Sequence, residues 1–294
     1  MKKTFLTVSL FAALIIAGCG GSEKGTNEMA ADTTKTEINA DTAAADQSSV
    51  LYNIPSPMET FTVLKVSGAT FDKSLLNPVN NITKYTSSYA KAVNLGTYSA
   101  DLSFCLLYKQ NQDINIYLKN VNELTSALDI DGNYVQTVAQ RLKVNSNNLD
   151  SIMQIVSEAT VNANMYLKEN QRDNITAIVT TGGWVEGMYF IANIANKTKK
   201  EEIVGLVADQ RNVVRNLVKI LEQFSSEPEV AGLLEDVKGI AAVYEGLKPV
   251  QDVAQASTED NIVSIGNNTS YELSNEQLKS ILEKITALRT KLTT

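Results

Sequence analysis

The segment SNEQLKSILEKITALRTKL, residues 274 to 292, carries the pattern that decides the fold. Its apolar side chains recur every three or four residues, which is the spacing of one face of an α-helix; they are Leu278, Ile281, Leu282, Ile285, Leu288 and Leu292. Ser274 and Gln277 form a capping-box pattern, in which each side chain can bond to the other residue's backbone amide. We therefore predict a final amphipathic helix that buries its apolar stripe.

The same spacing recurs through most of the chain after residue 50. Apolar stripes of helical period cover 57–68, 79–93, 98–106, 114–128, 133–143, 149–167, 175–194, 203–224 and 230–244. Short connections between amphipathic helices are typical of an all-α protein. We predict a single domain over 50–294, built as a multi-helix bundle of about eight or nine helices.

Two features qualify this fold prediction. An α-solenoid is the alternative, although no repeat of about 34 or 40 residues has matching positions. A short β-hairpin is possible near 262–273, around Gly266-Asn267-Asn268. Further capping boxes are expected at Thr198–Glu201 and Ser226–Glu229, each before another apolar stripe.

The N-terminus has the organisation of a secretory signal. Lys2 and Lys3 are followed by an apolar run from 4 to 17, which is shorter than the roughly 20 residues that cross a bilayer. The run ends in Ile16-Ala17-Gly18-Cys19, which resembles the lipobox of bacterial lipoproteins. That resemblance implies cleavage before Cys19 and acyl chains on this cysteine; the alternative is an ordinary signal with an incidental cysteine.

The resemblance covers 1–19 only, and it implies a lipid-anchored protein of the bacterial cell envelope. Gly20 stands where an Asp resembles an inner-membrane retention signal in proteobacteria, so the outer membrane is favoured. From Gly20 to about Ser49 the chain is rich in Gly, Ser, Thr, Ala, Asp and Glu. Such a composition cannot bury enough apolar surface to fold, so we expect a flexible tether over 19–49.

Composition excludes several classes of partner and chemistry. The net charge is −7 and no basic cluster is present, which argues against nucleic acid. The chain has no histidine, so Ser-His-Asp, Cys-His and HExxH sites cannot be built from it. If Cys19 is acylated, Cys105 has no disulfide partner, and it is expected to be a buried core residue. We find no nucleotide-binding motif and expect no cofactor and no metal site.

The stretch from Thr180 to Tyr189 is the first candidate for a ligand site. Gly182-Gly183 costs roughly 2 kcal/mol against alanine in a helix interior, so a structural gain should offset it. One interpretation is close helix approach, in which Gly183 and Gly187 admit a neighbouring backbone. The other is a break that opens a pocket lined by Trp184, Glu186 and Tyr189.

Tyr98 and Asp101 form the second candidate site. They lie one turn apart on a helix and could line a polar pocket. The alternative is a core helix in which Gly96 is a break and Asp101 is hydrogen-bonded to a Lys or Arg across an interface.

These features give three functional hypotheses. The first is a tethered binding or scaffold module that contacts the membrane through its acyl chains and binds an unknown envelope protein or small ligand. The second is a hydrolase of envelope glycans that uses carboxylates or tyrosine. The third is a structural spacer, which would have no pocket of ligand size.

Overall fold

A computed structural model describes residues 54–130, 132–250 and 270–294, all of which belong to one compact unit. The predictions for the signal, for Cys19, for the tether and for 262–269 of the hairpin lie outside the described residues. Among the described residues, no helix combines the length and the apolar character that a membrane span requires.

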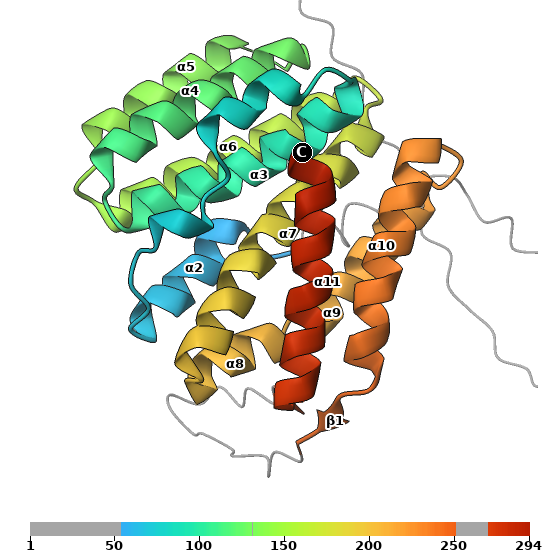
Figure 1. Cartoon of the computed structure of the whole chain (residues 1–294). Coiled ribbons are helices and arrows are strands. Elements are labelled where there is room, and N and C mark those ends of the chain that lie inside the picture. Colours follow the sequence, from blue (N-terminus) through green and yellow to red (C-terminus); the bar gives the residue numbers. More distant parts are fainter. Residues whose placement is uncertain (1–53, 131, 251–269) are drawn as a thin grey trace, which may run out of the picture. The chain divides into compact units, whose positions relative to one another are not determined.

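The prediction of an all-α bundle is confirmed, with ten α-helices in the described residues (Figure 1). They are α2 (Pro57–Val66), α3 (Ser88–Leu107), α4 (Asn111–Ala127), α5 (Gly132–Val144), α6 (Leu149–Glu169), α7 (Asp173–Thr198), α8 (Glu201–Ala208), α9 (Arg211–Glu222), α10 (Pro228–Glu245) and α11 (Asn275–Thr293). Two short 3₁₀ helices, η1 (Lys73–Leu75) and η2 (Val79–Lys84), lie between α2 and α3.

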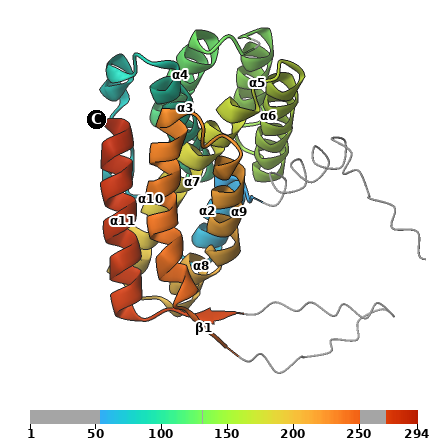
Figure 2. The same ribbon diagram turned by 90° about the vertical axis from the view of Figure 1, so that its right-hand side faces the viewer.

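Helix α7 organises the packing, because it contacts α2, α3, α6, α8, α9 and α11. Its central residues are buried almost all round, as expected for a helix enclosed by others. Phe190 of α7 packs against Phe61 of α2 and Phe104 of α3, with ring centroids 5.4 and 4.8 Å away. On another side of α7, α9, α10 and α11 stand next to one another (Figure 2).

Glycine brings α3 and α7 into backbone contact. A β-carbon placed on Gly96 would lie 2.0 Å from the carbonyl oxygen of Val179, and one on Gly182 would lie 2.0 Å from that of Val93. Helix α7 is continuous through Gly182-Gly183, so this segment is a site of close approach. Gly187 does not take part, since its nearest neighbour is the ring of Phe61 at 3.9 Å. Gly96 lies inside α3 and does not break it.

One of the three predicted capping boxes is present in the structure. The Ser274 box is present, with Oγ of Ser274 accepting from the amide of Gln277 at 3.2 Å. The boxes expected at Thr198 and Ser226 are wrong, because α7 ends at Thr198 and the caps of α8 and α10 are Lys200 and Glu227. A capping box that was not predicted begins α2, at Ser56 and Glu59.

Two predicted stripes also divide differently in the structure. The stripe over 79–93 contains η2 and the start of α3 instead of one helix, and the stripe over 203–224 is split between α8 and α9. The described residues contain one antiparallel strand pair, β1 (Lys248–Pro249) with β2 (Tyr271–Glu272). Only β2 falls in the stretch where a hairpin was expected.

Candidate functional site

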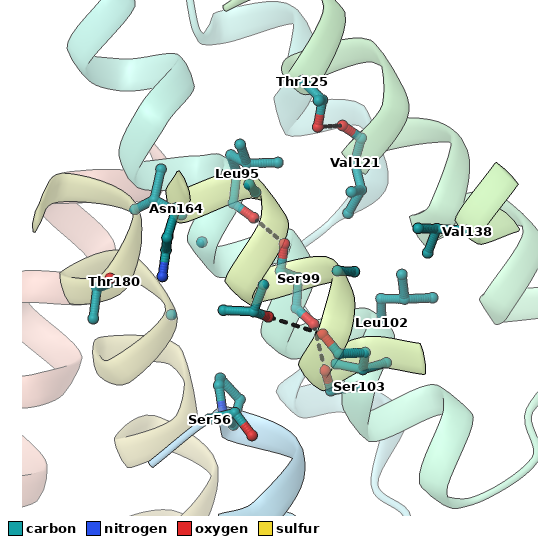
Figure 3. Close-up of a pocket in the computed structure, with 18 of the residues that line it drawn as sticks. Ser56, Leu95, Ser99, Leu102, Ser103, Val121, Thr125, Val138, Asn164 and Thr180 are labelled. Atoms are coloured by element: carbon teal, nitrogen blue, oxygen red, sulfur yellow. Dashed lines mark hydrogen bonds between the residues drawn. The ribbon is translucent and has the colours of Figure 1, made fainter. Parts of the chain in front are cut away.

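A cavity of about 270 Å³ lies among α3, α4, α5, α6 and α7, and residues 54–57 complete its wall (Figure 3). Its lining comes mainly from these five helices, which follow one another along the chain. This is the position that ligand sites between the helices of a bundle commonly have.

Small side chains explain why space remains between these helices. Helix α3 lines the cavity with Gly96, Ser99 and Ser103, and α6 lines it with Ala159 and Ala163. Larger apolar residues, among them Leu95 and Leu102 of α3, stand beside these positions. Interiors are normally packed without voids that exceed a water molecule, so a space of this size requires such runs of small residues.

Three hydroxyl groups in the wall contribute little polarity to the cavity. Ser99 donates to the carbonyl oxygen of Leu95 at 2.6 Å, Ser103 to that of Ser99 at 2.8 Å, and Thr125 to that of Val121 at 2.7 Å (Figure 3). Their protons are therefore committed within their own helices. No Asp, Glu, Lys or Arg lines the cavity in the part of the chain that the structure describes.

Trp184, the single tryptophan of the chain, lines the cavity from α7. Its side chain is buried, and its indole N–H donates to Oε1 of Gln210 at 3.1 Å. The polar edge of the indole is thus satisfied by the protein, which leaves the ring carbons as the surface offered to the cavity.

Glu186 and Arg289 form a buried ion pair away from the cavity lining. Nε and Nη2 of Arg289 donate to the two carboxylate oxygens of Glu186 at 2.6 and 2.7 Å, and the Glu186 side chain is fully buried. Nη2 also donates to the carbonyl oxygen of Leu75 at 2.9 Å, and the guanidinium lies 4.1 Å from the ring centroid of Tyr189. This two-point contact makes Glu186 an ionised partner of Arg289.

Asp101 lies beside this pair as a second buried carboxyl group. Burial raises its pKa well above the ordinary value, and the nearby Glu186 raises it further, while Arg289 opposes both. The amide of Asn77 donates to Oδ1 at 3.3 Å, and Oδ2 accepts no hydrogen bond from a donor in the described residues. A proton on Oδ2 would satisfy it, because a carboxylic acid can donate to the Glu186 carboxylate. We therefore assign the proton of the pair to Asp101.

Tyr98 is buried near Asp101, and its hydroxyl bonds to the segment before η2. Its hydroxyl donates to the carbonyl oxygen of Pro78 at 3.0 Å, while the Tyr117 hydroxyl donates to that of Asn77 at 2.8 Å. Burial raises the pKa of Tyr98, so the phenol stays protonated. These contacts anchor the segment before η2 against α3 and α4.

The structure thus divides the five predicted site residues into two groups. Trp184 lines the cavity, whereas Glu186, Tyr189 and Asp101 gather around Arg289, with Tyr98 next to Asp101. Asp101 has an arginine nearby, as the alternative interpretation expected, but the guanidinium donates its hydrogen bonds to Glu186 and to the carbonyl oxygen of Leu75. Cys105 is buried, and burial raises the pKa of its thiol.

Two signals for these sites were available in the sequence. The small residues Gly96, Ser99 and Ser103 recur at helical spacing, as do Ala159 and Ala163, and they mark the walls of the cavity. Arg289 interrupts the apolar stripe of the last helix one turn after Ile285, which is a sign of a buried charge.

Comparison with known proteins leaves the site to be interpreted from its own geometry. The described residues contain no group of three or more Cys, Asp or Glu side chains placed to hold a metal ion. No protein-family model, curated protein or solved structure matches this chain.

Proposed function

We propose that this protein is a lipid-anchored binding protein of the bacterial cell envelope, which holds an apolar small molecule in the cavity of about 270 Å³. The cavity is the observation that carries the proposal. The lining is mostly apolar, so an apolar ligand gains both dispersion contacts and burial there.

The N-terminal features supply the location in this proposal. A Cys19 that carries acyl chains would hold the domain at a membrane. The described residues contain no helix that could span the membrane. The outer membrane is the proposed site, on the basis of Gly20.

The other two hypotheses have less support. A structural spacer does not need a cavity of this size. A glycan hydrolase would need acidic side chains in its cavity, and no Asp or Glu of the described residues lines this one. Asp101 and Glu186 do lie close to each other, but both are fully buried beside Arg289, where no substrate reaches them.

The proposal is tested by filling the cavity. Ala159→Phe puts a ring into the space, and binding of the hydrophobic fluorophore 1-aminoanthracene should weaken by at least about tenfold because the ligand volume is lost. Val161→Phe is the matched control, since Val161 lies on the same helix and is exposed. Circular dichroism and thermal unfolding of both variants check that the bundle is intact.

Wild-type protein that does not bind the fluorophore, or a folded Ala159→Phe variant that binds it as well as Val161→Phe does, would contradict the proposed function.

A further inference from the structure

We infer that the ligand is a single acyl chain that ends in an uncharged, hydrogen-bonding head, such as a glyceryl ester. This inference rests on the proposed function and specifies its ligand. It follows from the length and the polarity of the cavity.

The cavity is elongated along α3. On α3 its lining runs from Leu95 to Leu106, and a rise of 1.5 Å per residue makes this a length of about 16 Å. This length accommodates one extended acyl chain, and the apolar side chains along it supply the dispersion contacts for that chain.

Two polar side chains in the wall have hydrogen-bonding capacity that the protein does not use. Asn164 of α6 and Thr180 of α7 both line the cavity, and neither side chain makes a hydrogen bond within the described residues. They lie toward the same side of the cavity in Figure 3, and both are half-buried. A ligand head placed there would receive an amide donor from Asn164 and a hydroxyl from Thr180 while its chain extends past Ser99 and Leu102.

The charge of the lining selects the type of head. An ionised carboxylate that enters the cavity loses its hydration and meets no Lys or Arg in the described lining. An ester or alcohol head loses less hydration, and Asn164 and Thr180 can replace its hydrogen bonds with water. The site should therefore favour a monoacylglycerol over the fatty-acid anion of equal chain length.

This chemistry has two sources, because the glyceryl esters on an acylated Cys19 resemble those of a free acylglycerol. The wall of the cavity includes Ile54 and Pro55, the first described residues after the N-terminal stretch. Displacement of the fluorophore by monoacylglycerol, measured on the acylated protein and on a Cys19→Ser form, distinguishes a free ligand from the protein's own acyl chain. Added monoacylglycerol binds both forms if the ligand is free, and only the Cys19→Ser form if the protein's own chain fills the site.

The experiment measures displacement of 1-aminoanthracene from the Cys19→Ser protein by monolaurin, by laurate at pH 8 and by dodecane. We expect monolaurin to bind at least about tenfold more tightly than laurate, since the anion is desolvated without a partner.

Conservative variants test the contacts of the ligand head. Asn164→Leu and Thr180→Val should each lower the affinity for monolaurin by about three- to tenfold, because each removes one hydrogen bond. The affinity for dodecane should not change. Thr125→Val is the matched control, because the Thr125 hydroxyl already donates to Val121. Its affinity for monolaurin should equal that of the wild-type chain.

The outcomes separate this inference from the proposed function. Fluorophore that binds but is displaced equally well by laurate and by monolaurin would overturn the ligand assignment alone, as would unchanged monolaurin affinity in the Asn164 and Thr180 variants. A protein that binds no fluorophore would overturn the proposed function itself.

Discussion

At the scale of single residues, the buried group around Arg289 is the least expected feature. Two carboxyl groups and one guanidinium are removed from water, and a buried pair of this kind rarely adds stability compared with apolar residues. The ion pair does fix the position of α11 along α7, because Arg289 of α11 bonds both to Glu186 of α7 and to the carbonyl oxygen of Leu75. A neutral Asp101 lets the group exist with one negative and one positive charge.

Asp101 gives a pH-dependent prediction. Its pKa is raised in the folded state, so the unfolded chain releases a proton that the folded chain keeps. Stability should therefore fall as the pH rises above about 4, the ordinary pKa of Asp, towards the folded pKa. Asp101→Asn resembles the protonated form and does not titrate.

We expect the Asp101→Asn variant to gain stability relative to the wild-type chain by up to about 1.4 kcal/mol per pH unit across this window. Urea unfolding between pH 5 and pH 8 measures the difference. A difference that stays constant with pH, or that shrinks as the pH rises, would show that Asp101 is ionised in the folded protein.

At the scale of elements, the contact between α3 and α7 depends on two glycines. Gly96→Ala or Gly182→Ala would place a β-carbon 2.0 Å from a backbone oxygen, which neither helix can avoid without moving. Each variant should lose about 1–3 kcal/mol of unfolding free energy. Gly232→Ala in α10 is the control: nothing lies within 4 Å, and alanine should stabilise this helix by about 0.5–1 kcal/mol.

Chemical denaturation of the three variants checks this prediction. If Gly96→Ala and Gly182→Ala unfold at the same denaturant concentration as Gly232→Ala, the two helices do not make backbone contact.

How far the sequence predicts these elements depends on the kind of signal. Periodicity located the helices, because an amphipathic stripe such as Leu278 to Leu292 requires burial on one side only. The predicted N-termini of α8 and α10 were wrong. Their caps, Lys200 and Glu227, make no side-chain hydrogen bond that a local sequence pattern could indicate. Gly182-Gly183 was ambiguous, since only the facing Gly96 distinguishes close packing from a break.

At the scale of the whole molecule, the five helices around the cavity create a site that no local motif encodes. Trp184 was a candidate because it is the single tryptophan, but Asn164 and Thr180 become relevant only when α6 and α7 are placed together. Tertiary packing, which depends on the summed volumes of residues from distant segments, cannot be read from the spacing within one helix.

The most direct test of the central claim uses Trp184 as a reporter within the cavity wall. A monoacylglycerol whose chain carries bromine quenches a tryptophan only on contact, and Trp184 is the single source of indole fluorescence in the chain. We predict saturable quenching at one ligand per protein in the wild-type chain, and its loss in Ala159→Phe. Fluorescence that is unchanged by the brominated ligand, or quenched equally in Ala159→Phe, would contradict the account.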